Sequence, residues 1–440
     1  MNAITAMRLG AAAAIAASAT FSTVARAEAI DDLRRQIETL TQKVAELERT
    51  QLAPTSRDSN GPSSASAVSG GATKGSFKLP GSDTSITIGG YVKADAVFSD
   101  RSAGVGSTAD QEYEAGAVPV GPNAGADERG QLKLHARQSR FFLQTSTPSS
   151  WGDASTYLEF DLFGSSGNES VSNSHNLRLR HAYATLGGLL VGQTWTTFAD
   201  TDVYPETLDF GGPAGQIFAR QAQVRWTQPF ASGQWSIALE NPETVVALPG
   251  GDAFRADDDR FPDIAGNIRF RAAGGKYSLA GIVRQIRVDS GSAPAARAAR
   301  WGGALGANGV VAVGQRDDVR LSAYYGNAIG RYSTGFFSDG VLDADAHLAL
   351  PAQWAALAAL RHYWSPRLRT TLALSALRAD NPPGAGPTVN RSAASEHLNL
   401  IWSPIAKANL GVEYLHATRT VDNGQSGRLN RLQASAQYFF

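Results

Sequence analysis

The amino-acid sequence predicts an all-β protein, a sixteen-stranded antiparallel transmembrane β-barrel with an N-terminal α-helical coiled-coil segment. From about residue 77 to residue 440, hydrophobic and polar residues alternate in segments of about ten residues, which is typical of the strands of a membrane barrel. The connections between these segments alternate between long and short. Tryptophans lie near the segment ends, as in the two aromatic girdles of such a barrel, whereas a soluble β-sandwich more often has them in mid-strand.

The first 27 residues have the pattern of a secretory signal peptide. Arg8 precedes an apolar run at 9–21, and Ala25-Arg26-Ala27 follows it as a cleavage motif, so we expect cleavage before Glu28. The run is shorter than the roughly 20 apolar residues of a spanning helix, which makes a membrane anchor the less favoured interpretation. The sequence therefore predicts an exported protein.

Residues 28–52 are expected to form a periplasmic coiled coil, and residues 53–76, which are rich in Pro, Ser, Gly and Ala, a flexible linker. The apolar residues of the first segment follow a 3-4-3-4-3 spacing and are Ile30, Leu33, Ile37, Leu40, Val44 and Leu47. β-branched residues at a and leucine at d favour a dimer, but about three heptads are too few to decide the stoichiometry. The alternative is an amphipathic helix on the protein's own surface.

Sixteen alternating segments follow the linker, and each is expected to be one strand of the barrel. In the first of them, Ile86, Ile88 and Val92 fall on one face, whereas Lys93 and Asp95 fall on the other. The expected strands are 84–98, 131–147, 154–163, 177–186, 189–195, 220–227, 234–240, 264–272, 276–288, 301–313, 318–326, 353–363, 368–379, 395–402, 408–418 and 429–440.

The gaps between these strands favour an outer-membrane barrel over a soluble sandwich. Long gaps such as 99–130, 241–263 and 327–352 alternate with short ones such as 187–188, 273–275 and 403–404. Short periplasmic turns and long outer loops produce this alternation. An even number of strands also leaves both chain ends on the periplasmic side.

The last strand is expected to close the barrel against the first, because an open sheet edge in lipid would leave backbone amides unpaired. Five residues are expected to face lipid or a neighbouring protomer: Leu432, Ala434, Ala436, Tyr438 and Phe440. Four are expected to face the pore: Arg431, Gln433, Ser435 and Gln437. Sixteen strands are expected to enclose an aqueous lumen rather than a packed core.

Composition excludes several other classes. The chain has 40 basic and 40 acidic residues, so no net charge points to nucleic acid. It has no cysteine, which excludes disulfides and cysteine-based metal or redox sites. Its seven histidines show no metal-ligand spacing, so we expect no metal and no cofactor. Asp257, Asp258 and Asp259 are a possible calcium site, but a solvated loop is the favoured interpretation.

Several motifs resemble the DcaP-type trimeric porins of Gram-negative outer membranes. These are HARQSRFF (135–142), LRLRHAYATLGGLLVGQTWTTFAD (177–200), DFGGPAGQ (209–216) and YYGNAIGRY (324–332). The resemblance covers the whole mature chain, including the heptad segment and the linker. It implies a homotrimer of barrels among outer-membrane lipid and lipopolysaccharide, with a periplasmic coiled coil. It also implies passive diffusion of small anions, with dicarboxylates as the named class, and no catalysis.

Arginines are expected to line the pore, because the chain has 33 Arg and only 7 Lys. The planar guanidinium binds carboxylates through two hydrogen bonds. The expected pore-lining residues are Lys93, Arg137, Arg140, Arg178, Arg180, Arg220, Arg225, Arg269, Arg271 and Arg320. Arg140 and Arg220 are expected to be neighbours of these residues, and a bulge near residues 137–142 leaves the parity of the strand there open. The alternative is that these arginines only supply the charge that any polar barrel wall needs.

Residues 196–219 follow the fifth strand, and the resemblance implies that they fold into the pore as its constriction loop. Asp200, Asp202, Glu206 and Asp209 are acidic and are expected to oppose the arginines across the narrowest point. Gly211, Gly212 and Pro213 suit a sharp turn. The alternative is an ordinary outer loop whose acids are solvated.

Four further hypotheses remain open. The pore could belong to a phosphate-type anion porin, although such porins depend on lysine clusters and lysine is scarce here. It could also be a weakly selective general porin. The coiled coil could tether the membrane to the cell wall. An outer-membrane hydrolase is disfavoured, because Ser174 and His175 fall in an expected loop.

Overall fold

In this computed structural model the described residues are 38, 42–43, 70–71, 75–101, 111–121, 129–165, 170–256, 258–290, 296–334 and 337–440. The expected signal peptide (1–27) lies outside the described residues. Most of the expected coiled coil (28–52) and linker (53–76) lies outside them too, although Glu38, Gln42 and Lys43 are helical. No helix among the described residues is long and apolar enough to cross a membrane.

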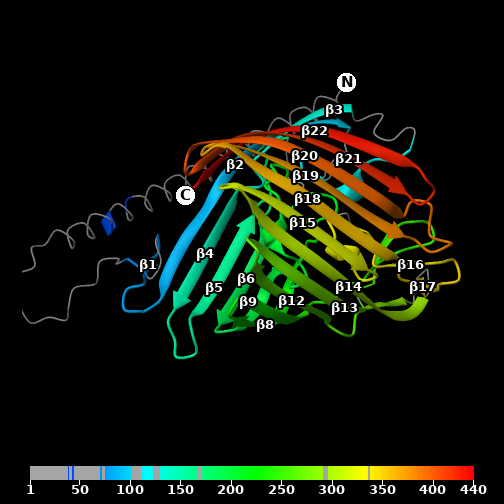
Figure 1. The fold of residues 1–440 in the computed structure, drawn as a ribbon, viewed down its shortest axis with the longest axis horizontal. Coiled ribbons are helices and arrows are strands. Elements are labelled where there is room, and N and C mark those ends of the chain that lie inside the picture. The colour runs from blue at the N-terminus through cyan, green and yellow to red at the C-terminus, as the bar shows by residue number, and fades with distance from the viewer. Residues whose placement is uncertain are drawn as a thin grey trace, which may run out of the picture. The chain divides into compact units, whose positions relative to one another are not determined.

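The strands form a closed antiparallel barrel with sixteen wall positions, which confirms the predicted fold class (Figure 1). The wall strands are β2 (Ser85–Arg101), β3 (Arg129–His135), β4 (Arg140–Thr147), β5 (Ala154–Asp161), β6 (Arg178–Leu186), β7 (Leu189–Trp195), β8 (Arg220–Phe230), β9 (Gly233–Glu240), β12 (Asp263–Ala272), β13 (Gly275–Ser290), β14 (Ala296–Val313), β15 (Asp317–Gly326), β18 (Ala352–Ser365), β19 (Leu368–Asp380), β20 (Asn390–Ile405), β21 (Ala408–Val421) and β22 (Ser426–Phe439). Strands β3 and β4 both pair with β2 and occupy one wall position between them.

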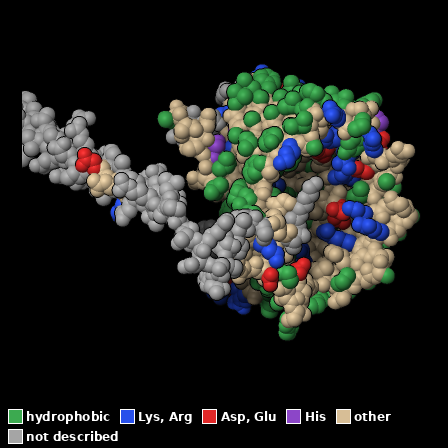
Figure 2. Space-filling model, turned by 90° about the vertical axis from the view of Figure 1, so that its left-hand side faces the viewer, with side chains coloured by type: hydrophobic (Ala, Val, Ile, Leu, Met, Phe, Trp, Pro, Cys, Tyr) green, Lys and Arg blue, Asp and Glu red, His purple; other side chains and the backbone are tan. Residues whose placement is uncertain are grey.

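Strand β22 closes the barrel by pairing with β2, from Tyr91 opposite Phe439 to Ser99 opposite Arg431. Its alternation is as predicted, because Leu432 and Tyr438 are exposed on the outer face, whereas Arg431 and Gln433 are buried inside. Figure 2 shows the same division at the short-turn end, with hydrophobic side chains over the outer wall and charged side chains around a hollow centre.

The structure departs from the expected strands in two ways. The expected strand 131–147 is broken at 136–139, where Arg137 turns inward to bind loop carbonyls, one of which is Leu162 O at 3.4 Å from its Nε. Strands β13, β14 and β20 also extend further into the outer loops than expected. Hydrophobic alternation marks only the part of a strand that faces lipid, so it does not define the ends of longer strands.

Four short strands form a separate sheet among the outer loops: β10 (Val245–Ala247), β11 (Ala253–Arg255), β16 (Gly340–Leu342) and β17 (Leu348–Ala349). Val246 and Leu342 of this sheet pack with Ile286 and Val288 of the long strand β13. The remaining elements are β1 (Phe77–Lys78), which pairs with β2, and the 3-10 turns η2 (Ala115–Ala117), η3 (Thr201–Val203) and η4 (Gly330–Tyr332).

Part of the barrel interior is a hydrophobic core, which corrects the expectation of a lumen without one. Three loops bring apolar side chains together there: the loop after β2, residues 196–219 after β7, and the loop after β15. Phe198, Ile217 and Tyr332 are almost completely buried in this cluster, against alanine and leucine side chains of the wall. Folded loops therefore fill space that sixteen strands alone would leave to water.

Candidate pore-lining site

Residues 196–219, called the inner loop from here on, run inside the barrel after β7. At its start Thr196 Oγ1 donates to Glu240 Oε2 at 2.6 Å, and the backbone N–H of Thr197 donates to Glu240 Oε1 at 2.6 Å. Near its end, the N–H of Gly215 donates to Ser375 Oγ at 2.8 Å. These contacts join the loop to the inner faces of β9 and β19.

All four acidic residues of the inner loop bind cations or donors of the barrel wall. Asp200 accepts a hydrogen bond from Ser278 at 2.5 Å and lies 3.8 Å from Arg269. The other pairs are Asp202 with Lys276 at 3.2 Å, Glu206 with Arg369 at 2.5 Å, and Asp209 with Arg431 at 2.8 Å. The acids thus attach the loop to the wall from β12 to β22. Each acid therefore has a partner on the wall, and their expected position opposite the arginines at the narrowest point stays a prediction.

Asp209 connects three parts of the chain. Besides Arg431, it accepts hydrogen bonds from the backbone N–H groups of Tyr113 at 2.7 Å and Gly211 at 2.9 Å. Burial raises the pKa of its carboxyl, but the charge of Arg431 and the bond from Tyr113 outweigh burial and hold that pKa below its ordinary value. Asp209 is therefore ionised at neutral pH.

Five arginines share the inner wall from β4 to β8 with two carboxylates. Arg178 binds Asp161 through two hydrogen bonds of 2.9 and 2.8 Å. Arg180 binds both Glu159 at 2.6 Å and Asp161 at 2.9 Å. Arg140 lies 3.4 Å from Glu159. A bulge between β5 and β6 puts Arg180 and His181 both on the inside, although they are adjacent in sequence.

Arg220 and Arg225 have no such partner among the described residues. The Nη1 of Arg220 and the Nε of Arg225 are enclosed by protein and have no hydrogen-bond partner in the described part of the structure. The Arg220 guanidinium lies between two aromatic rings, 4.8 Å from the centre of Trp195 and 4.8 Å from that of Phe218. These rings hold it in place without neutralising it. The five arginines Arg140, Arg178, Arg180, Arg220 and Arg225, called the arginine cluster below, therefore outnumber the carboxylates Glu159 and Asp161 on this wall.

A family model described as DcaP outer membrane protein matches residues 17–440 of the chain. The chain belongs to the DcaP outer membrane protein family. It is an outer-membrane porin and not an enzyme, since both its family and its fold are those of porins.

Solved structures of porins share the fold. The outer membrane channel DcaP of Acinetobacter baumannii has a TM-score of 0.70 and 22% identity, over 81% of this chain and 97% of that chain. The anion-selective porin from Comamonas acidovorans has a TM-score of 0.55 and 12% identity, over 81% and 100%. OmpT of Vibrio cholerae in its trimer form has a TM-score of 0.51 and 11% identity, over 81% and 99%. None of the curated proteins matches the chain.

The other expected pore-lining residues of this DcaP-family chain lie outside the arginine cluster, and most of them have partners of their own. Lys93 is buried and pairs with Asp95 at 3.0 Å, and it donates to the inner-loop carbonyl of Leu208 at 2.7 Å. Arg137 is fully buried and donates to Gln111 at 2.9 Å. Arg320 pairs with Asp318 at 2.7 Å. Arg269 and Arg271 lie on β12, near the short-turn end, away from the arginine cluster in sequence.

The ten expected pore-lining site residues do not include five interior arginines that join loops to the wall: Arg284, Arg331, Arg361, Arg369 and Arg431. The alternation rule places some of them correctly. Arg431 was expected to face the pore, and Arg369 shares its inward face with the buried Thr371. Their partners Asp339, Glu206 and Asp209 lie in loops, where no such alternation exists.

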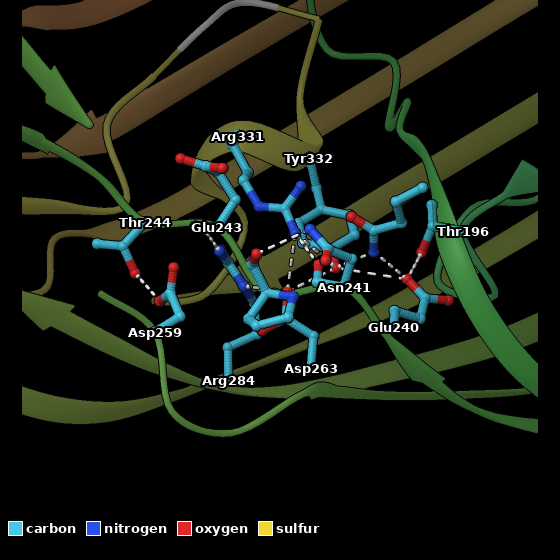
Figure 3. Close-up of polar contacts among 12 residues, drawn as sticks. Thr196, Glu240, Asn241, Glu243, Thr244, Asp259, Asp263, Arg284, Arg331 and Tyr332 are labelled. Atoms are coloured by element: carbon cyan, nitrogen blue, oxygen red, sulfur yellow. Dashed lines mark hydrogen bonds and ion pairs between the residues drawn. The ribbon is translucent and has the colours of Figure 1, made fainter. Parts of the chain in front are cut away.

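A polar cluster inside the barrel attaches the loop after β15 to the wall (Figure 3). Arg284 of β13 is fully buried and binds Asp263 of β12 at 2.9 Å and Asp339 of the loop at 2.6 Å. Tyr332 of the same loop donates to Asp263 at 2.8 Å, and Arg331 also binds Asp263, at 3.0 Å. The loop is therefore fixed to the wall through ion pairs whose carboxylates, Asp263 and Asp339, are fully buried.

One group in the described outer loops has metal-ligand atoms close together. Atoms of Asp343, Asp345 and His347 lie within 4.8 Å of one another, and the group is largely solvent-exposed. Asp343 also accepts backbone hydrogen bonds from Asp345 at 2.9 Å and His347 at 2.8 Å, which is an ordinary loop arrangement. Of the three adjacent acids named as a possible calcium site, Asp257 lies outside the described residues.

Proposed function

We propose that this porin conducts small anions in preference to cations, with dicarboxylates as the favoured class. The observation that supports the proposal is Arg220, a guanidinium that is enclosed beside other arginines and has no carboxylate partner among the residues that the structure describes. Three arginines of the cluster share Glu159 and Asp161, which leaves Arg220 and Arg225 to an anion from solution.

The physical reason is electrostatic. Arginines without acidic partners make the electrostatic potential in the pore positive. The pore is narrow and its walls have a low dielectric constant, so the potential is concentrated inside it. Guanidinium groups bind a carboxylate through two parallel hydrogen bonds. A solute with two carboxylates can contact two arginines at once, while exchange among several neighbouring arginines keeps each contact weak enough for release.

Planar-bilayer recordings test the proposal. In a KCl gradient the reversal potential of the wild type should indicate anion preference, and succinate should block the current. Arg220→Gln should weaken succinate block by about tenfold, which corresponds to roughly 1.4 kcal/mol. Arg297→Gln is the control, because Arg297 is 88% exposed in the outer part of β14. Cation preference of the wild type without succinate block would overturn the proposal.

The phosphate-type alternative is less favoured because the cluster contains only arginine, and the chain has no lysine between Lys133 and Lys276. Competition between phosphate and succinate for block separates these two hypotheses. A weakly selective general porin would show a reversal potential near zero and no block by either anion.

We further propose that three copies of the chain assemble as a homotrimer in the outer membrane, surrounded by lipid and lipopolysaccharide, with the N-terminal segment in the periplasm. The trimer form of a porin with the same fold supports the stoichiometry. Mass determination of the detergent-solubilised protein tests it.

Deletion of residues 29–75 tests a tether to the cell wall, because envelope integrity should then change while conductance stays the same.

A further inference from the structure

We propose that the short-turn end of the pore holds a second anion subsite, formed by Arg271 with Lys276 and Arg269, which receives one carboxylate of a small organic anion. This inference rests on the proposed function and adds a place where the solute pauses on the periplasmic side. Short turns mark the periplasmic end of outer-membrane barrels. The subsite lies on β12 and β13, whereas the arginine cluster lies on β4 to β8.

The register of the sheet brings two cations face to face. Arg271 of β12 is directly opposite Lys276 of β13, and Arg269 is opposite Ser278, whose side chain is buried inside the barrel. Directly opposed residues share a face of the sheet, so Arg271 and Lys276 both belong to the inner face. Like charges at directly opposed positions are destabilising, and an anion between them relieves that cost.

The inner loop neutralises this group only in part. Lys276 lies 3.2 Å from Asp202, and Arg269 donates to the carbonyl of Ala199 at 3.0 Å and lies 3.8 Å from Asp200. The side chain of Arg271 is exposed and has no hydrogen bond or ion pair with any residue that the structure describes, although its backbone N–H donates to the carbonyl of Ser232 at 3.0 Å. The three cations of the group are therefore accompanied by two carboxylates, those of Asp200 and Asp202. The positive charge that stays without a counter-charge in the group is that of Arg271.

The group surrounds a cavity of about 560 Å³, which lies within the size range of small-molecule sites. Its walls include Asp200, Asp202, Arg269, Arg271 and Lys276, together with residues 231–234, which form the turn after β8 and the start of β9. The turn after β8 and the facing ends of β12 and β13 all lie at the short-turn end of the barrel. The cavity therefore opens at that mouth of the pore. Figure 2 views this end, where basic and acidic side chains surround the central hollow.

The register also connects the subsite to the arginine cluster. Arg225 of β8 is opposite Ala238 of β9, which is opposite Ala265 of β12. Arg269 and Arg271 come four and six residues after Ala265, on the same inner face of β12 and nearer the short turn. A solute that leaves Arg220 therefore meets Arg225, Arg269 and Arg271 in order. Several weak sites in series permit both selection and release.

One-sided addition of succinate to oriented channels tests the subsite. The chain has no cysteine of its own. A cysteine introduced as Gly250→Cys in an outer loop, where a Cβ would meet no other atom within 4 Å, therefore reports orientation through a membrane-impermeant thiol reagent. Arg271→Gln should lower the association rate of succinate from the short-turn side by about tenfold at low salt and leave the rate from the long-loop side unchanged.

Arg367→Gln is the matched control, because Arg367 is an exposed arginine at the same end, in the turn between β18 and β19, and does not line the cavity. Equal association rates for wild type and Arg271→Gln from the short-turn side would overturn the subsite, even if Arg220→Gln weakens block as proposed. A fall with Arg271→Gln while Arg220→Gln has no effect would support the subsite and contradict the arginine cluster as the selective site. Absence of block from either side in the wild type would overturn both.

Discussion

The carboxylate of Asp209 lies 2.8 Å from the guanidinium of Arg431, and both side chains are almost completely buried. The pair joins the inner loop to β22, the strand that closes the barrel. Asp209 also accepts a hydrogen bond from the backbone N–H of Tyr113 in the loop after β2. A single carboxylate thus connects the inner loop, the loop after β2 and the closing strand. The position of the inner loop therefore depends on contacts that its own sequence does not contain.

Asp209→Asn is expected to release this part of the inner loop. Breaking a buried ion pair leaves Arg431 without a counter-charge and costs about 3–5 kcal/mol in the free energy of unfolding. Single-channel recordings should show larger current fluctuations, and thermal unfolding should begin at a lower temperature. Arg297→Gln removes an exposed ion pair with Asp289 and should change neither measurement. Wild-type current noise in Asp209→Asn would contradict the anchoring role.

Arg284→Met is expected to free the loop after β15. The substitution leaves Asp263 and Asp339 buried without their shared cation, at a cost of about 3–5 kcal/mol. Limited proteolysis of the folded barrel should then cut within residues 327–351, while the strands stay protected. Arg316→Met is the control, since Arg316 lies exposed in the turn between β14 and β15. A loop as resistant as that of the wild type would show that other contacts suffice to hold it.

Anion preference is expected to decline as the pH rises from about 6.5 to 9. Burial raises the pKa of Glu112, in the loop after β2, to about 8, against the attraction of Arg178. Ionisation of Glu112 then adds a negative charge near the arginine cluster. A raised carboxyl pKa means that the folded state holds a proton which the unfolded chain has released, so stability falls as the pH rises from the ordinary value of 4.5 to about 8.

Glu112→Gln is the variant that separates this effect from others. Its reversal potential in a KCl gradient should show no change over the same pH range, because the glutamine does not ionise. Its stability should also lose the decline between pH 4.5 and 8 that Glu112 causes in the wild type. An equal change of reversal potential with pH in wild type and variant would assign the titration to another group.

Deletion of Phe440 is expected to impair assembly and not conductance. The backbone N–H of Phe440 donates to the carbonyl of Gly90 on β2 at 3.2 Å, at the point where the barrel closes. Gly90 has a φ of +153°, and a Cβ there would lie 2.1 Å from the carbonyl oxygen of Arg140, so the closure is tightly fitted. Folded-trimer yield should fall on unheated gels, while channels that do form should conduct normally. Wild-type trimer yield after the deletion would refute the prediction.

Alternation in the sequence is sufficient to predict the barrel and the direction of most wall residues. Leu432 faces outward and Arg431 inward as expected, because a period of two depends only on the strand itself. Alternation fails where the strand is irregular. At residue 136 the strand breaks, and beside Glu159 a bulge places Arg180 and His181 on the same side. These departures depend on partners in other strands and loops.

The sequence by itself determined the class of fold, the number of strands, the closure by the last strand and the abundance of interior arginine. Tertiary structure alone decided which arginines remain unpaired. Asp209 meets Arg431, and Glu206 meets Arg369, only because the inner loop runs along the wall from β12 to β22. Arg220 and Arg271 have no acidic partner within the described part of the chain for the same reason. A local pattern sets the direction of a side chain, but the neutralisation of its charge depends on residues that the closed barrel brings together from distant positions.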